Sequence, residues 1–296
     1  ICQGYREFPR PGREILVDQF AMTLGSASAI CAAGLARLGS AVSFAGKVGA
    51  DLWGDYCTEF LAKFGVDTSL VVKDPALQTG LTISISSEAD RALVTYLGAI
   101  RELRESDVSD AMLARFGHLH VSSFFLQEGL RPGLEKLFTR ARALGLTTSL
   151  DTGFDPSEEW GPGLAEVLSV TDVFLPNEVE LAAISGSDEI LEALRSLENG
   201  RTITAAKLGA KGAAARVDGK LVECPPLAVK PVDTTGAGDS FNAGFLHCWV
   251  RGEDVRTCLH AGVFAGGKST EAMGGTGSQP DGETLEAYLQ DVRAAR

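Results

Sequence analysis

The fold is decided by the stretch Val229-Lys-Pro-Val-Asp-Thr-Thr-Gly-Ala-Gly-Asp-Ser-Phe-Asn-Ala-Gly244. Pro231 disfavours helix at its own position and before it, so the first residues should be extended. From Asp239 onward, helical spacing brings four apolar residues to one face: Phe241, Phe245, Cys248 and Trp249. A glycine turn that opens a helix leaves free backbone amides and the positive end of the helix dipole facing outward. The stretch therefore predicts an anion-binding site.

One carboxylate, Asp239, falls in the first turn of that predicted helix. When a phosphoryl group is transferred to an alcohol, a carboxylate there can accept the hydroxyl proton while the amides hold the moving group. The alternative is that Asp239 only caps the helix, because aspartate is favoured at helix N-termini in general. Taken alone, the stretch leaves both roles open.

Short apolar runs alternate with helical segments along much of the chain. Helices are expected at 29–38 and 134–144, since each pattern ends at a glycine. Strands are expected at 41–45, 147–150, 173–175 and 202–208, followed by a hairpin around Asp218-Gly219. This alternation is typical of an α/β fold with a mostly parallel sheet.

Two segments depart from this rhythm. Residues 81–86 alternate apolar and polar side chains with period two, and residues 92–96 follow after a polar turn at Glu88-Ala-Asp90. They predict a hairpin with one exposed face, to which residues 15–24 can add a strand. We interpret these segments as a small β lid over the main domain; the alternative is an ordinary surface hairpin.

The composition excludes several classes of protein. The 296 residues carry a formal net charge of −12, which repels phosphate backbones, so nucleic acid is not an expected partner. No run of about 18 apolar residues occurs, and we expect no membrane partner. The six cysteines form no C-x-x-C pair, which is typical of reduced thiols in the cytoplasm. We expect no signal peptide, and the start at Ile1 instead of Met suggests missing upstream residues.

Several motifs resemble those of the ribokinase-like (PfkB) carbohydrate kinases, in consistent order along nearly the whole chain. Residues 233–244 resemble the C-terminal signature of that family. The other matching segments are Gly25 to Gly39, Val48-Gly-Ala-Asp-Leu-Trp-Gly54, Asn177-Glu-Val-Glu180 and Lys207-Leu-Gly-Ala-Lys-Gly212. The resemblance implies a three-layer fold, with a central, mostly parallel sheet flanked by helices and a β lid. We expect residues 24–78 and 97–296 to form the α/β domain and residues 12–23 and 79–96 to form the lid.

The resemblance also implies an activity, the ATP-dependent phosphorylation of a hydroxyl group on a sugar or sugar-like substrate. Asp239 would be the general base. The anion hole would consist of the backbone amides of Gly236, Ala237 and Gly238. Such a reaction needs no covalent enzyme intermediate, because positioning and electrostatics carry it.

Nucleotide and metal binding would follow from the same resemblance. Asn177 and Glu180 would organise Mg²⁺ and the phosphates of ATP, with Glu180 acting through water because Mg²⁺ keeps its hydration shell. Asp233 and Thr235 would offer oxygens to a monovalent cation such as K⁺. The nucleotide-binding turn would contribute Lys207, Gly209, Lys211 and Gly212.

The expected substrate pocket contains Gly25, Ser26 and Asp151, of which Asp151 ends a strand on the side where α/β folds bind ligands. A local turn or cap is the alternative role for Asp151. The chain departs from the family here, since Ser26 and Ile30 replace the usual glycine and asparagine, and Gly153 stands where asparagine is common. The substrate is therefore less defined than the phosphoryl-transfer end. The resemblance also implies a homodimer formed through the lid.

Two further motifs compete for a functional interpretation. Gly262-Val-Phe-Ala-Gly-Gly-Lys-Ser269 fits the P-loop pattern, but a helical spacing precedes it where a strand is required, so we expect a close-packed helix. His118 and His120 lie on one face of a predicted strand and could suggest a metal site. No third ligand is evident, so structural roles are expected for both.

Two rival functions stay open. A nucleoside kinase of the same family would share the phosphoryl-transfer end. A non-catalytic sugar- or nucleotide-binding relative with a regulatory role would explain the changed substrate residues. The retained Asp239, Asn177 and Glu180 argue against the second rival, because a protein without catalytic activity need not keep all three.

Overall fold

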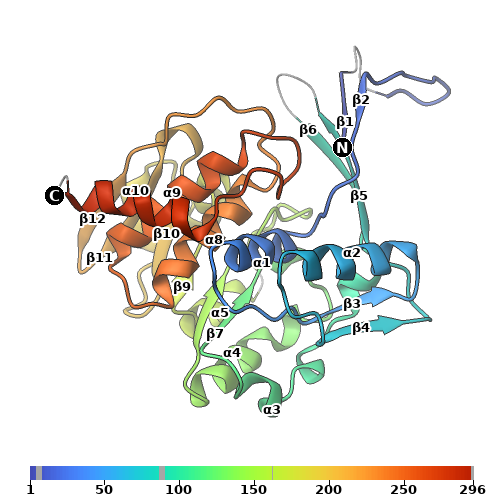
Figure 1. The fold of residues 1–296 in the computed structure, drawn as a ribbon. Coiled ribbons are helices and arrows are strands. Elements are labelled where there is room, and N and C mark those ends of the chain that lie inside the picture. Colours follow the sequence, from blue (N-terminus) through green and yellow to red (C-terminus); the bar gives the residue numbers. More distant parts are fainter. Residues whose placement is uncertain (5–8, 87–90, 162, 295–296) are drawn as a thin grey trace.

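A six-stranded sheet lies at the centre of the molecule in the order β12-β11-β10-β9-β8-β7 (Figure 1). Strands β7 to β10 are parallel, and β11 and β12 extend the sheet in antiparallel fashion. The bounds are β7 His118–Val121, β8 Thr147–Leu150, β9 Val173–Phe174, β10 Ile203–Lys207, β11 Ala213–Val217 and β12 Lys220–Cys224. The expected mostly parallel sheet and the hairpin at Asp218-Gly219 are confirmed.

The computed structural model describes residues 1–4, 9–86, 91–161 and 163–294. The polar turn expected at residues 88–90 lies outside these ranges. No helix within them is long and apolar enough to cross a membrane.

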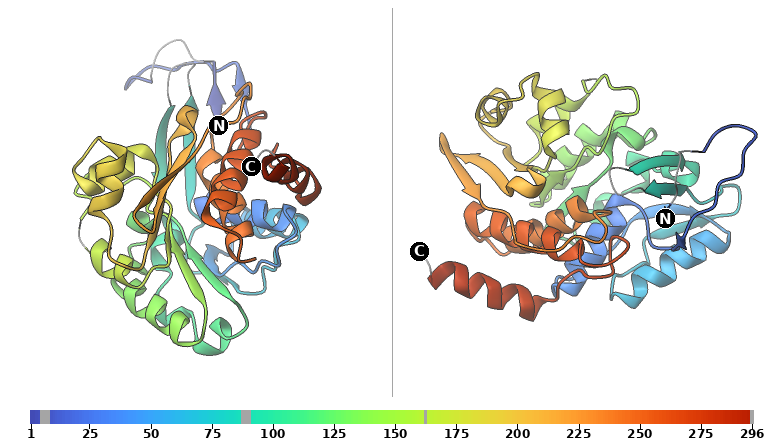
Figure 2. Two further views of the ribbon diagram at one scale, coloured as in Figure 1. Left: turned by 90° about the vertical axis from the view of Figure 1, so that its left-hand side faces the viewer. Right: turned by 90° about the horizontal axis from the view of Figure 1, so that it is seen from above.

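Helices cover both faces of the central sheet, as the side view in Figure 2 shows. On one face lie α1 (Ala27–Arg37), α8 (Ala237–Trp249), α9 (Val255–Ser269) and α10 (Gly282–Ala294). On the other lie α3 (Asp110–Leu113), α4 (Leu134–Ala143), α5 (Leu164–Ser169), α6 (Glu178–Ser185) and α7 (Ile190–Ser196). Successive side chains of β9 and the residue after it point to opposite faces of the sheet. Val173 and Leu175 therefore pack in one buried cluster, and Phe174 packs in the other.

A second sheet projects from this body (Figure 1). Its order is β2-β1-β5-β6, from β1 (Cys2–Gln3), β2 (Gln19–Phe20), β5 (Leu81–Ser86) and β6 (Arg91–Tyr96). The β5–β6 hairpin is confirmed, with Ile83 opposite Val94, but exposed residues lie on both of its faces and not on one face as expected. Of the strand expected over 15–24, only Gln19–Phe20 is formed. We call these four strands the lid sheet.

The strand expected at 41–45 is misplaced. The structure has β3 at Gly46–Gly49, paired in parallel with β4 (Val71–Asp74), and residues 41–45 contribute only a bridge between Ser43 and Asp67. Because glycine weakens strands in general, the sequence pattern favoured a strand in the apolar run 41–45 over one in the glycine-containing segment that follows it. Here glycine is required, because a Cβ at Gly49 would lie 2.7 Å from the Leu77 carbonyl oxygen. Helix α2 (Leu52–Lys63) follows β3 directly.

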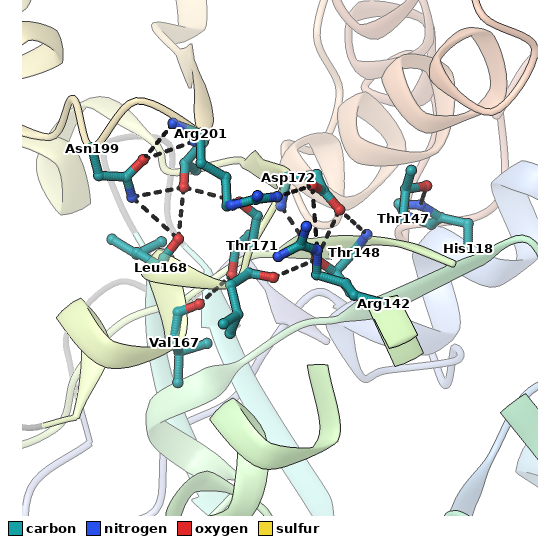
Figure 3. Close-up of polar contacts among 12 residues, drawn as sticks. His118, Arg142, Thr147, Thr148, Val167, Leu168, Thr171, Asp172, Asn199 and Arg201 are labelled. Atoms are coloured by element: carbon teal, nitrogen blue, oxygen red, sulfur yellow. Dashed lines mark hydrogen bonds and ion pairs between the residues drawn. The ribbon is translucent and has the colours of Figure 1, made fainter. Parts of the chain in front are cut away.

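A cluster of polar side chains links the N-terminal ends of the central strands to one another (Figure 3). The backbone N–H of Thr148 in β8 donates to Asp172 Oδ2 over 2.8 Å, just before β9. The Asp172 carboxylate also pairs with Arg201, ahead of β10, at 3.2 Å, and with Arg142 at 3.8 Å. These contacts tie three strands together at the end of the sheet opposite their carboxyl termini.

Helices α8 and α9 approach each other so closely that only glycine fits at the contact. A Cβ at Gly262 would lie 2.8 Å from the Phe241 ring, and a Cβ at Gly266 would lie 2.9 Å from the Ala237 carbonyl oxygen. A Cβ at Gly244 would overlap the backbone of Ala261. The segment that resembles a P-loop is therefore part of a close-packed helix, as its spacing predicted.

Candidate active site

The glycine turn before α8 has the geometry that its sequence predicts. Gly236 has φ 72°, a left-handed conformation, and a Cβ there would lie 2.6 Å from the Cα of Gly275. Helix α8 starts at Ala237, so the amides of residues 236–238 fall in its N-terminal turn, where no intrahelical acceptor exists; the N–H of Ala237 donates to the Thr234 carbonyl oxygen at 3.2 Å. Asp239 follows in the same turn and is half-buried.

Ile30, the apolar replacement in the first glycine motif, packs beneath this turn. Its side chain is 4% exposed, and its Cγ2 atom would lie 3.1 Å from a Cβ at Gly236. Gln279 donates from Nε2 to the Ile30 carbonyl oxygen at 3.0 Å and to Ser240 Oγ at 2.9 Å, which ties α1 to α8. Ile30 therefore packs against the glycine turn before α8.

Asp233 holds the segment that leads into the turn. Its Oδ1 atom accepts from the N–H of Thr235 at 2.9 Å and from the Thr235 hydroxyl at 2.8 Å. Its Oδ2 atom accepts from the N–H of Gly274 at 2.9 Å. The carboxylate thus joins residues 233–235 to the loop after α9 and presents oxygens at its junction with α8.

A buried ionic network lies on the other side of the turn. Lys207, the last residue of β10, donates from Nζ to Asp151 Oδ2 at 2.6 Å and to Asn242 Oδ1 at 3.3 Å. Asn242 donates from Nδ2 to the same Asp151 oxygen at 2.5 Å. Burial opposes ionisation of Asp151, but the ammonium of Lys207 outweighs it and keeps the pKa of Asp151 low. The network joins the carboxyl ends of β8 and β10 to α8.

Asn177 and Glu180 form a capping box at the start of α6. Asn177 Oδ1 accepts from the N–H of Glu180 at 2.9 Å, and Glu180 Oε2 accepts from the N–H of Asn177 at 2.9 Å. Asn177 Nδ2 also donates to Glu180 Oε1 at 2.7 Å. Asn177 forms a bridge with Lys207, so the box lies beside the ionic network.

Burial raises the pKa of Glu180 to about 7, and the neighbouring charges of Asp151 and Asp239 act in the same direction. Mg²⁺ would favour the ionised form. The donor set suits that ion, because it holds one carboxylate and one amide, and Mg²⁺ takes its remaining ligands from phosphates and water. Within the described residues, no three His, Cys, Asp or Glu side chains converge as a complete metal cage.

Replacing Glu180 by Gln is expected to change how stability depends on pH. In the free protein, Glu180 binds a proton more tightly when folded than when unfolded, so its contribution to stability falls as pH rises from about 4.5 to about 7. The variant should therefore exceed the wild type in free energy of unfolding by on the order of 3 kcal/mol at pH 8, with little difference at pH 4.5. Urea unfolding across this range measures the effect. Glu178→Gln, on the same helix but only half-buried, is the control, and an equal pH dependence in both variants would contradict the assignment.

The turn after β10 comprises Gly209–Lys211, and Gly212 leads into β11. Gly212 has φ 92°, and a Cβ there would overlap the Cys224 carbonyl oxygen, so no other residue fits. Gly209 has φ 56° with open space around it. Lys211 is exposed and pairs with Glu178 at 2.6 Å.

The residues expected to bind substrate are spread over two places. Gly25 and Ser26 precede α1, where Ser26 has φ 67° and accepts from the N–H of Ala29 through its hydroxyl. Both are exposed, and a Cβ on Gly25 would meet nothing within 4 Å. Asp151 instead is 4% exposed, and its Oδ1 atom accepts from the N–H of Gly153 at 2.9 Å.

The structure brings together Asp151, Glu180, Lys207 and Asp239, since each carboxylate raises the pKa of Lys207. A Cβ at Gly238 would lie 3.5 Å from Lys207 Nζ, so the first turn of α8 borders this group. Sequence reasoning missed Asn242 and the packing role of Ile30. Asn242 falls three residues after Asp239 on α8, and that spacing was the available signal.

The two strand histidines have structural partners. His118 contacts the hydroxyls of Thr147 at 2.7 Å and Ser149 at 2.8 Å, and His120 contacts Ser149 at 2.7 Å and Ser122 at 2.8 Å. Burial lowers the pKa of His118 to about 3 and that of His120 to about 4. The hydroxyls occupy the ring nitrogens, which supports the structural role expected for both.

Comparisons with known proteins identify the family and the relatives of this chain. Residues 2–282 match the model of the family described as pfkB family carbohydrate kinase. The chain is 30% identical over 243 residues to an uncharacterized sugar kinase of Archaeoglobus fulgidus, covering 81% of this chain and 96% of the relative. It is 27% identical to a deoxyribokinase of Salmonella typhi, covering 96% and 93%. It is also 27% identical to a nucleoside kinase of Methanothermobacter thermautotrophicus, covering 95% and 90%.

Solved structures share the fold. Ribokinase from Arabidopsis thaliana, complexed with ribose and ATP, superposes with a TM-score of 0.85 at 24% identity, covering 98% of this chain and 94% of that one. An E. coli protein in complex with ATP and Mg²⁺ superposes with a TM-score of 0.81 at 24% identity, covering 95% and 94%. The fold of this chain is therefore a known one.

Proposed function

The chain belongs to the pfkB family of carbohydrate kinases and is a phosphotransferase with an alcohol group as acceptor, and from this premise we propose how it acts. It transfers the γ-phosphoryl group of ATP to a hydroxyl of a sugar or sugar-like substrate, with Asp239 as general base. One observation carries the proposal: Asp239 follows three amides in the first turn of α8, beside Lys207 and Glu180.

The chemistry follows from that placement. The acceptor oxygen forms a bond to the γ-phosphorus, the bond from that phosphorus to the bridging oxygen of ADP breaks, and Asp239 takes the hydroxyl proton. The amides of Gly236, Ala237 and Gly238 hold the equatorial phosphoryl oxygens as an anion hole. When bound, Mg²⁺ would neutralise charge on the β- and γ-phosphates.

We assign the nucleotide to the edge of the sheet where β10 ends. Asn177 and Glu180 face the phosphates, with Glu180 acting on Mg²⁺ through water. Gly209 and Gly212 let the backbone approach the nucleotide, and Lys211 lies on the same turn. For K⁺, Asp233 and Thr235 supply oxygen donors near the turn. The relative that carries ATP and Mg²⁺ has the same fold, which supports this cofactor pair.

The acceptor is placed by Gly25, Ser26 and Asp151, and a sugar is favoured because relatives include a sugar kinase and a deoxyribokinase. A nucleoside is the runner-up, supported by the nucleoside kinase among the relatives. A cytoplasmic location suits the six free cysteines.

An assay of ATP consumption over a panel of sugars, sugar acids and nucleosides tests the function. Turnover that depends on a sugar supports the proposal, and turnover with nucleosides alone favours the runner-up. Thermal-shift measurements with a non-hydrolysable ATP analogue, run over the same panel, identify binding without turnover. That outcome would favour a non-catalytic regulatory relative.

We further propose that residues 12–23 and 79–96 act as a lid on the domain formed by 24–78 and 97–296, and that two lid sheets pair in a homodimer. One face of the β5–β6 hairpin is apolar and exposed, with Ile83 46% and Val94 57% accessible. The opposite face carries Thr82 and Thr95, whose hydroxyls lie 3.0 Å apart. An exposed apolar strand face of this kind marks an interaction surface.

Val94→Lys is expected to convert the dimer to a monomer, because it places a charge in the apolar interface. The dissociation constant should rise by at least about tenfold, corresponding to about 1.4 kcal/mol. Sedimentation velocity over a dilution series measures it. Thr95→Lys, the next residue on the opposite face, is the matched control, and equal behaviour of the two variants would refute pairing through the apolar face.

A further inference from the structure

Three buried side chains from separate elements meet under the anion-binding turn. The Lys207 and Asp151 side chains are 10% and 5% exposed, and Asn242 is fully buried. Lys207 reaches the carboxylate of Asp151 at 2.6 Å and the amide oxygen of Asn242 at 3.3 Å. A buried ammonium held by two partners has a fixed position, because both contacts would have to break before it could move.

The ammonium group lies against the turn itself. A lysine ammonium has three N–H donors, and in the described part of the chain two acceptors are assigned to Lys207. A Cβ built on Gly238 would lie 3.5 Å from Lys207 Nζ. The third donor is therefore available within reach of the place where the amides of residues 236–238 would hold an anion.

The charges around this place require a cation. Asp151, Glu180 and Asp239 all act on the ammonium, and the whole chain carries a net charge of −12. Burial alone would lower the pKa of Lys207, but the carboxylates of Asp151 and Glu180 outweigh it and raise the pKa. Lys207 thus stays protonated, and without it the repulsion between these carboxylates and a phosphoryl group would be opposed only by backbone amides and the Mg²⁺ that ATP would bring.

We propose that Lys207 is a catalytic residue that donates its third hydrogen bond to the γ-phosphoryl group during the transfer. Asp151 and Asn242 are positioning residues that hold the Lys207 ammonium in place. The inference rests on the proposed function and gives Lys207 a role separate from the nucleotide turn. Beside its proposed contact with the acceptor, Asp151 then acts on the transferred group through Lys207, because its Oδ2 atom accepts from both Lys207 and Asn242. Lys207 keeps all its protons throughout, and the hydroxyl proton goes to Asp239.

Lys207→Met in the full chain tests this role. Loss of one charged donor to the transferred group should lower kcat by about 10²–10³-fold. Affinity for a non-hydrolysable ATP analogue should fall about tenfold, whereas affinity for ADP, which lacks the contacted group, should change less than about threefold. The control is Lys220→Met on β12, an exposed lysine, which should match the wild type.

Three outcomes overturn the proposal. They are a kcat above about a third of the wild-type value, equal weakening of the ATP analogue and ADP, or a loss of thermal stability with an unchanged ratio of the two affinities. Lys207→Gln keeps a hydrogen bond to Asp151 without the charge, so it gives the same test if Lys207→Met fails to fold. If the wild type itself phosphorylates nothing in the panel, the proposed function fails, and the two nucleotide affinities still decide the role of Lys207.

Discussion

Asp239→Asn is expected to lower kcat by about 10²–10⁴-fold without destabilising the protein. The amide has the size and shape of the carboxylate, but it cannot take a proton from the acceptor hydroxyl. The negative charge of Asp239 raises the pKa values of both Glu180 and Lys207, so its removal relieves one repulsion and loses one attraction in the folded state. Loss of turnover with an unchanged or higher melting temperature is the signature of a base rather than of a structural cap.

Steady-state kinetics with the best acceptor from the panel, together with thermal melting, measure both effects. Asp218→Asn is the matched control, because Asp218 is exposed at the β11–β12 turn and has φ 48°, which asparagine tolerates well. Retention of more than about a tenth of the wild-type rate by Asp239→Asn would remove Asp239 from the role of base. A drop in melting temperature instead would indicate a cap.

Gly244→Leu is expected to lower the free energy of unfolding by about 3 kcal/mol. A Cβ at this position would overlap the Ala261 carbonyl oxygen and lie 2.8 Å from the Cβ of Ala265, so α9 has to move away from α8. Overpacking of this kind typically costs about 1–3 kcal/mol, and here the obstructing atoms are backbone, which cannot change rotamer. The melting temperature should fall by roughly 6–12 °C.

Thermal and urea unfolding measure this effect against Gly117→Ala. A Cβ at Gly117 would meet nothing within 4 Å, so that control should stay within about 0.5 kcal/mol of the wild type. If Gly244→Leu were as stable as the control, the contact between α8 and α9 would have to be looser than the structure has it. Activity measured below the unfolding temperature of the variant shows whether the substitution also damages the active site, apart from its effect on stability.

The backbone of the glycine turn before α8 could be predicted from sequence because its signals are local. Residues 233–239 specify their own conformation: a proline limits the entry, a glycine permits φ 72°, and a helix follows. The spacing of Asn177 and Glu180 likewise encodes a capping box within four residues. Such signals need no information about distant parts of the chain.

The ionic network could not be predicted in the same way. Asp151, Lys207 and Asn242 are separated by 56 and 35 residues, and only the parallel sheet brings their strand ends beside α8. Each residue looked like part of another motif when taken alone. The position of β3 was predicted wrongly for a related reason, since Gly49 is explained by backbone from residues 77–79, which local propensity does not describe.

The glycine contact between α8 and α9 also has a consequence for motion. Helix α8 carries Asp239 at one end and is buried along most of its length against α9, so its amide hydrogens should exchange with solvent only when the whole core opens. The lid sheet, with exposed residues on both faces of its β5–β6 hairpin, should exchange through local opening at far lower cost. The enzyme would then bind and release ligands by moving the lid, while the catalytic turn keeps its shape through every cycle.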